Sequence, residues 1–225
     1  MSSINNIHKR FALILMDPQN GFINDGYWSR MFPIGQSTPI LESFQRIVLF
    51  LRSIPNPHLI PILISETGFS RRDRQIFEPI ANEISQHGFS SITRTYKPHT
   101  NLSICPGVHQ WLQEQFESKL DVVIGGCTIT SCIRDSSIQI KKMFPQLNLF
   151  VDRNLCAARK DNYVERCEKC LEKYMIYGSP PIQDCTTCLS EDLTKQMLSP
   201  VQLAFQQMKD AGVYVIDNYS LTTNS

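Results

Sequence analysis

The sequence Asp121-Val-Val-Ile-Gly-Gly-Cys-Thr-Ile-Thr-Ser-Cys132 joins a short apolar run to a polar turn that ends in a cysteine. The run Asp121 to Gly125 has the length and the β-branched content of a buried strand. A helix follows it, as indicated by apolar residues at helical spacing, Ile133, Ile140 and Met143. Cys132 is therefore expected at or near a helix N-terminus, where free backbone N–H groups and the helix dipole stabilise a thiolate. The same N–H groups are donors that an oxyanion needs during acyl transfer.

Asp17 and Lys97 also come after strand-like runs, Phe11–Met16 and Phe89–Thr93. In an open parallel sheet, ligands bind outside the carboxyl ends of the strands, so residues distant in sequence can meet there. An acid, an ammonium and a thiol at one rim are the parts of a cysteine hydrolase. The alternative is that Cys132 is an ordinary buried thiol, but its combination with Asp17 and Lys97 favours catalysis.

The rest of the chain alternates strand and helix patterns. Further strands are predicted at 61–64, 147–151 and 213–216, and helices after Pro39, over 74–87, after Pro106 and around 201–208. This alternation implies βαβ units with right-handed crossovers. The alternation thus predicts a parallel sheet in a three-layer α/β/α arrangement. Our full prediction is a single domain over residues 1–225 with about six parallel strands in the order 3-2-1-4-5-6.

Composition excludes several classes of function. The 225 residues are 42% hydrophobic, enough for one substantial core, and the formal charge of +1 gives no field that would favour nucleic acid or an anionic membrane. No apolar stretch approaches the length of a membrane span, and the run ending before Asp17 is too short for a signal peptide. We expect a cytoplasmic homo-oligomer with a small-molecule substrate and no nucleic-acid or membrane partner.

Two Cys-x-x-Cys motifs, Cys167-Glu-Lys-Cys170 and Cys185-Thr-Thr-Cys188, are separated by 14 residues. This spacing fits a tetrahedral zinc site, and four thiolates leave no open coordination position, so the ion would be structural. Two disulfides or an iron–sulfur cluster are the alternatives. The motifs fall in an apparent insertion, residues 159–193. Its stretch 159–173 holds five basic and four acidic residues, a poor phosphate-binding surface, so a lid or a dimer contact is favoured.

Several segments resemble motifs of the isochorismatase-like cysteine hydrolases. The matching segments are Asp17-Pro-Gln-Asn-Gly-Phe22, Tyr96-Lys97-Pro98, Gly126-Cys-Thr-Ile-Thr-Ser-Cys132, Asp152-Arg-Asn-Leu-Cys-Ala157 and the last helix and strand, Ala204 to Ile216. They correspond to the family's Asp-x-Gln-x-x-Phe motif, lysine segment, nucleophile turn and strand-end Asp-Ala region. The resemblance covers most of residues 10–158 and again 194–217.

The resemblance implies Asp17 as general base, Cys132 as nucleophile and Lys97 as the charge between them. It also implies a cis peptide bond before Thr128, with the backbone amides of Thr128 and Cys132 as the oxyanion hole. The residues implied for the substrate site are Phe22, Cys127 and Thr128. Phe69 is either a pocket residue or a core aromatic.

Departures from the family pattern restrict the reactions that this sequence is expected to catalyse. Nicotinamidases of this superfamily carry an Asp-x-His and a further His after the second strand, whereas Ser65 to Arg74 contains no histidine. Because imidazole is a preferred ligand for zinc and iron, no active-site metal is expected. Family members that hydrolyse the vinyl ether of isochorismate often lack the cysteine, so Cys132 favours attack on an amide or related acyl carbon.

These features predict an isochorismatase-like hydrolase that cleaves a small amide or acyl substrate through a thioester on Cys132. One alternative is a vinyl-ether hydrolase that depends on Asp17 and not on Cys132. The other is a catalytically silent binding module that acts through the zinc insertion. The resting Cys132 is expected to be a low-pKa thiol that alkylates faster than Cys105 or Cys156.

Overall fold

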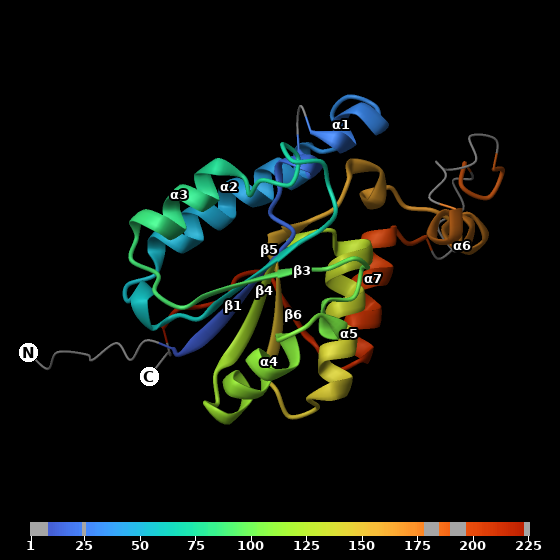
Figure 1. Ribbon diagram of the computed structural model, residues 1–225. Helices are drawn as coiled ribbons and strands as arrows, with labels where there is room; N and C mark the ends of the chain where they lie inside the picture. Colours follow the sequence, from blue (N-terminus) through green and yellow to red (C-terminus); the bar gives the residue numbers. More distant parts are fainter. Residues whose placement is uncertain (1–8, 24–25, 178–184, 190–196, 223–225) are drawn as a thin grey trace, which may run out of the picture.

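A six-stranded parallel sheet forms the centre of the computed structural model, which describes residues 9–23, 26–177, 185–189 and 197–222 (Figure 1). The strand order is β3-β2-β1-β4-β5-β6, which confirms the predicted order. The strands are β1 (Phe11–Met16), β2 (Ile62–Glu66), β3 (Ile92–Tyr96), β4 (Asp121–Cys127), β5 (Leu149–Ala157) and β6 (Tyr214–Ile216). Every pair of neighbours is parallel, so all six carboxyl ends lie at one edge.

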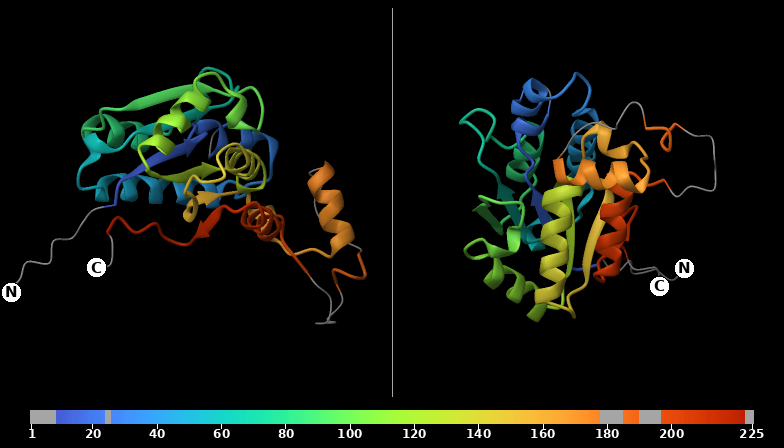
Figure 2. Two further views of the ribbon diagram at one scale, coloured as in Figure 1. Left: turned by 90° about the horizontal axis from the view of Figure 1, so that it is seen from below. Right: turned by 90° about the vertical axis from the view of Figure 1, so that its right-hand side faces the viewer.

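Helices cover both faces of the sheet and give the predicted three layers (Figures 1 and 2). The helices are α1 (Tyr27–Met31), α2 (Thr38–Ser53), α3 (Glu78–Gln86), α4 (Val108–Glu117), α5 (Arg134–Met143), α6 (Glu168–Tyr177) and α7 (Pro200–Asp210). Helices α2 and α3 pack on one face, and α4, α5 and α7 on the other. Short helical turns include η1 (Asn20–Phe22), η2 (Pro57–Leu59), η3 (Leu102–Ile104), the π-helical η4 (Ile129–Ile133) and η5 (Lys160–Tyr163). No described helix combines the length and apolar character needed to cross a bilayer.

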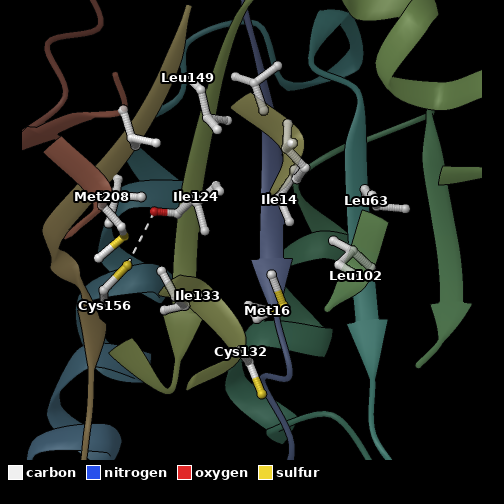
Figure 3. Packing of buried hydrophobic residues seen from close by; sticks show 14 of the residues in the cluster. Ile14, Met16, Leu63, Leu102, Ile124, Cys132, Ile133, Leu149, Cys156 and Met208 are labelled. Carbon is white, nitrogen blue, oxygen red and sulfur yellow. Dashed lines mark hydrogen bonds between the residues drawn. The ribbon is translucent and has the colours of Figure 1, made fainter. Parts of the chain in front are cut away.

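The central strand β1 connects the two hydrophobic cores. All six of its residues are buried, and successive side chains point to opposite faces. Ala12, Ile14 and Met16 join the core under α4, α5 and α7, whereas Phe11, Leu13 and Leu15 join the core under α2 and α3. This explains why β1 reads as a continuous apolar run rather than an alternating one. In Figure 3, Cys132 lies at the edge of the core under α4, α5 and α7, near the carboxyl ends of the strands. Its sulfur points away from the apolar side chains.

The third strand differs from the prediction. It runs from Ile92 to Tyr96, not from Phe89 to Thr93, so Lys97 directly follows its last residue. As an edge strand it alternates exposed and half-buried side chains, and it has no apolar run to mark it. The second helix begins at Glu78 rather than Arg74, because Ile76 bridges to Gln19 and the Phe77 N–H donates to the carbonyl of Pro18.

The cysteine motifs lie on a unit that projects from the body of the domain. Helix α6, which the sequence analysis did not predict, stands apart from the sheet in Figure 1 and in the left view of Figure 2. The chain enters and leaves this unit through an antiparallel bridge between Arg166 and Leu198, with mutual backbone hydrogen bonds of 3.0 and 3.1 Å. Part of the predicted insertion, 178–184 and 190–193, lies outside the described residues.

We predict that Gly126→Ala strongly destabilises the domain. Gly126 has φ +118°, and a Cβ there would lie 2.1 Å from the Met16 carbonyl oxygen on β1. Because backbone cannot move aside as a side chain can, the expected loss is about 3 kcal/mol or more of unfolding free energy. The matched control is Gly88→Ala, with φ +88° and no atom within 4 Å of the added Cβ. It should lose about 1–2 kcal/mol from the left-handed conformation alone. Equal losses in urea denaturation would contradict this explanation.

Candidate active site and metal centre

The structure brings Asp17, Lys97 and Cys132 together at the carboxyl edge of the sheet. Asp17 follows β1, Lys97 follows β3, and Cys132 lies in the π-helical turn η4 between β4 and α5. Lys97 Nζ is 2.6 Å from Asp17 Oδ2 and 3.2 Å from Cys132 Sγ. The exposed fractions are 0% for Asp17, 1% for Lys97 and 8% for Cys132. The three groups form one buried cluster, and the cysteine is its most exposed member.

Ser65, on the neighbouring strand β2, orients Asp17. The Asp17 N–H donates to the Ser65 carbonyl over 3.1 Å, and Ser65 Oγ donates to Asp17 Oδ1 over 2.8 Å. Asp17 itself has φ 50°, a conformation that non-glycine residues rarely adopt. Sequence reasoning did not single out Ser65. The available signal was a hydroxyl at the end of a neighbouring apolar strand, in register with Met16.

Gln19 holds the loops that follow β1 and β2. Its side chain is fully buried, and its amide nitrogen donates to the carbonyls of Thr67 and Arg74 over 3.2 and 2.9 Å. Its amide oxygen accepts a 2.8 Å hydrogen bond from the Thr67 N–H. The glutamine of the Asp-x-Gln motif thus joins two loops at the carboxyl edge of the sheet.

Burial and charge determine the resting protonation of the cluster. Burial alone would lower the pKa of Lys97, but Asp17 and Cys132 outweigh it and raise that pKa above its usual value. Burial raises the pKa of Asp17, and Lys97 and Ser65 offset only part of this rise. Burial, followed by the Asp17 charge, raises the pKa of Cys132 to about 11 despite Lys97. The resting site is therefore an Asp17–Lys97 ion pair beside a neutral thiol.

The expectation of a low-pKa Cys132 was wrong. The sequence analysis placed a cation and a helix N-terminus beside the thiol, and both effects favour the thiolate. It did not include the desolvation of a buried sulfur or the carboxylate that shares the same cation. Cys105 and Cys156 also have pKa values raised by burial, so all three thiols are neutral at neutral pH.

The turn before Cys132 has an unusual backbone conformation. The Cys127–Thr128 peptide bond is cis, as the family resemblance implied. The Ser131 and Ile133 N–H groups both donate to the Thr128 carbonyl, over 3.3 and 3.1 Å, and fix the turn that leads to Cys132. The side chain of Cys127 is fully buried, and its sulfur donates to the Asp17 carbonyl over 3.4 Å. Any contact of Cys127 with a ligand would therefore come from its backbone.

An aromatic cluster lies on the segments that leave β1 and β2. Phe22 makes edge-to-face contacts with Trp28 and Phe69, each with ring centroids 4.7 Å apart. Trp28 in turn contacts Phe32 at 5.4 Å, and Tyr27 contacts Phe69 at 5.8 Å. Phe22 is buried and follows Asp17 by five residues. The aromatic cluster comprises Phe22, Tyr27, Trp28, Phe32 and Phe69.

The second cluster consists of Cys167, Cys170, Cys185 and Cys188. All four are free thiols, and their sulfur atoms lie within 4.8 Å of one another. A tetrahedral zinc ion with bonds of about 2.3 Å needs sulfur–sulfur separations of about 3.8 Å. The Cys167 and Cys185 sulfurs are 3.8 Å apart, and the Cys167 N–H donates to Cys188 Sγ over 3.3 Å. The donor type, number and spacing therefore fit a four-thiolate metal site, and the sulfur atoms are too far apart to be disulfides.

We predict that the alkylation of Cys132 depends steeply on pH. With a thiol pKa of about 11, its reaction with iodoacetamide should be slow near neutral pH and should still rise above pH 9. Asp17→Asn removes a charge that raises this pKa, so labelling at pH 8 should become faster. Lys97→Met removes a charge that lowers it, so labelling should become slower. Peptide mapping of labelled protein measures both rates, and a reversed order of the two variants would contradict the charge assignment.

Comparison with known proteins supports the fold directly. No family model and no curated protein matches this chain. Among solved structures, the nicotinamidase from Staphylococcus aureus matches with a TM-score of 0.60 at 13% identity, covering 93% of this chain and 99% of that one. The pyrazinamidase/nicotinamidase from Streptococcus mutans has a TM-score of 0.57 at 14% identity, covering 91% and 99%. An isochorismatase from Pseudomonas putida has a TM-score of 0.57 at 12% identity, covering 92% and 88%. The chain therefore has the α/β fold of the isochorismatase-like hydrolases that its motifs resemble.

Proposed function

We propose that this protein is a cysteine-dependent hydrolase of a small amide or related acyl substrate. The main support for the proposal is that Lys97 Nζ contacts both Asp17 and Cys132. The family resemblance assigns the oxyanion hole to the backbone amides of Thr128 and Cys132, and the cis Cys127–Thr128 bond that it implies is present. The solved nicotinamidases and isochorismatase with the same fold support a hydrolase.

The proposed reaction begins with the substrate carbonyl oxygen accepting hydrogen bonds from the amides of Thr128 and Cys132. Asp17 takes the thiol proton as the sulfur forms a bond to the carbonyl carbon. The negative charge then passes to the carbonyl oxygen, where the two amides stabilise it. Collapse of this intermediate breaks the C–N bond, and the leaving amine takes the proton from Asp17. Asp17 next removes a proton from water, which attacks the thioester and releases the acid and the neutral thiol.

The neutral resting thiol is compatible with this sequence. A buried thiolate is unstable without a partner, but in concerted attack the charge develops as the carbonyl carbon and the two amides become available to receive it. Lys97 stays protonated throughout, because its raised pKa keeps the charge beside both acidic groups. It holds Asp17 in place and lowers the free energy of each anionic state.

We predict that Asp17→Asn lowers turnover by about 10²–10⁴-fold, the usual contribution of proton transfer, while Cys132→Ala abolishes amide cleavage. The measurement is a mass-spectrometric screen of small amides and esters, with detection of the acyl adduct on the Cys132 peptide. Asp210→Asn, in the last turn of α7, is the matched control and should retain full activity.

Two outcomes would contradict the proposal. Activity that survives Cys132→Ala but not Asp17→Asn would indicate a vinyl-ether hydrolase. No turnover and no adduct across the panel would indicate a binding module.

We also propose that the four-cysteine cluster binds one structural zinc ion and that residues 159–193 form a zinc-binding insertion in a single domain. All four ligand positions would be filled by thiolates, so the ion would have no position for substrate. Binding to such sites contributes on the order of 10 kcal/mol in small peptides, which is ample to order a short segment.

We predict one zinc ion per chain in protein purified without chelator. Cys185→Ser should release the ion and make the insertion sensitive to protease, while the sheet remains folded because its core lies elsewhere. Cys105→Ser, outside the cluster, should retain zinc. Elemental analysis and limited proteolysis provide the measurements, and metal-free protein with intact disulfides by mass would contradict the assignment.

A further inference from the structure

We propose that the metal-binding unit fixes the aromatic cluster at the candidate active site through two arginines, Arg166 and Arg159, so that metal loading controls access to Cys132. The metal-binding unit comprises α6 and the four cysteines. The consequence for substrate rests on the hydrolase function proposed above, but the coupling itself is physical and can be measured without turnover.

Arg166 is the first link, at the bridge through which the chain enters the unit. Its side chain is fully buried directly before Cys167, and its guanidinium lies 4.0 Å from the ring centroid of Tyr174 on α6. Its hydrogen bonds go to the uncharged carbonyls of Val164 and Asp161.

The four-cysteine cluster reaches both partners of this contact. Cys167 directly follows Arg166, and Cys170 lies on α6 together with Tyr174. One metal ion bound by the cluster would therefore tie Arg166 and α6 together and hold the guanidinium over the Tyr174 ring. Without the ion, the cysteines lose their common partner and α6 loses this support.

Arg159 is the second link, and it contacts both α6 and the aromatic cluster. Its guanidinium donates to the Tyr174 hydroxyl over 3.4 Å. The same group lies 3.7 Å from the ring centroid of Phe32 and 5.6 Å from that of Trp28. Contacts of this kind contribute about 0.5–2 kcal/mol each. One side chain thus joins the metal-binding unit to the aromatic cluster.

Gln36, which follows Phe32 in the segment after α1, adds hydrogen bonds to the same connection. The Lys160 N–H donates to the Gln36 carbonyl, and the Asp161 N–H donates to Gln36 Oε1, each over 2.9 Å. Gln36 Nε2 donates back to Asp161 Oδ1 over 2.8 Å. The Asp161 carbonyl also accepts a hydrogen bond from Arg166. These hydrogen bonds therefore join the segment after α1 to the bridge residue Arg166.

On its inner side, α6 faces a hollow. A hollow of about 1370 Å³ separates α6 from α5 and α7, with Met175 on one wall and Arg134 and Gln207 on the other. The helix stands clear of the sheet in Figure 2. The contacts of Tyr174 with Arg159 and Arg166 therefore join α6 to the domain on the side away from this hollow.

The test uses the whole protein with Trp111→Phe, which leaves Trp28 as the single tryptophan. Two quantities are measured before and after a chelator removes the metal: quenching of Trp28 fluorescence by acrylamide, and labelling of Cys132 by iodoacetamide at pH 9. We expect both to rise at least about twofold on metal removal. Because Trp111 is buried and its replacement can disturb folding, the Cys132 labelling is repeated in the chain with Trp111 intact.

Arg159→Ala should produce the same increases with the metal still bound, and metal removal should then add little. Arg153→Ala is the matched control, because Arg153 also lies 5.3 Å from an aromatic ring, that of Phe205, away from α1. It should change neither signal. With a substrate in hand, Arg159→Ala should raise KM more than it lowers kcat.

The proposal is overturned if metal removal makes α6 protease-sensitive but leaves Trp28 quenching and Cys132 labelling unchanged. It is equally overturned if the protein binds no metal. If both signals respond but no substrate is cleaved, the coupling stands and the hydrolase function fails, so the two proposals are separable.

Discussion

The ion pair between Lys97 and Asp17 is the interaction on which the candidate site depends. Both groups are almost fully excluded from solvent, and an isolated charge there would cost several kcal/mol. Removing either partner from such a buried pair typically costs about 3–5 kcal/mol, because the remaining charge is left uncompensated. The pair therefore requires that β1 and β3 both keep their register with β2, which lies between them. It also places the Lys97 ammonium beside the Cys132 thiol.

That constraint also explains the state of the cysteine. The ammonium is shared between a carboxylate and a thiol, and the carboxylate is the stronger acid, so it holds the charge at rest. The sulfur stays neutral until a ligand supplies a new place for negative charge. A buried thiol of this kind is protected from oxidation and alkylation, which require the thiolate. Reactivity would then be conferred by the ligand rather than stored in the resting protein.

Much of the fold was predictable because the apolar runs of β1, β2 and β4 are long and sharply ended, and the strand order followed correctly. The meeting of Asp17, Lys97 and Cys132 followed from parallel topology alone. The edge strand β3 was misplaced because half of its residues are exposed, so it lacks the apolar signal used to find strands. Ser65 and Arg159 were missed because each acts through a neighbour distant in sequence. The raised pKa of Cys132 depends on burial, which motif spacing does not measure.

The bridge between Arg166 and Leu198 has an architectural consequence. The two residues lie side by side, so the chain leaves the α/β domain and returns to it at nearly the same point. Everything between them could be replaced by a short turn without altering the path of β5 or α7. An insertion whose two ends lie side by side can be gained, lost or enlarged in evolution while the sheet is left unchanged. The path of the α/β fold is thus independent of the length and content of the cysteine-bearing segment.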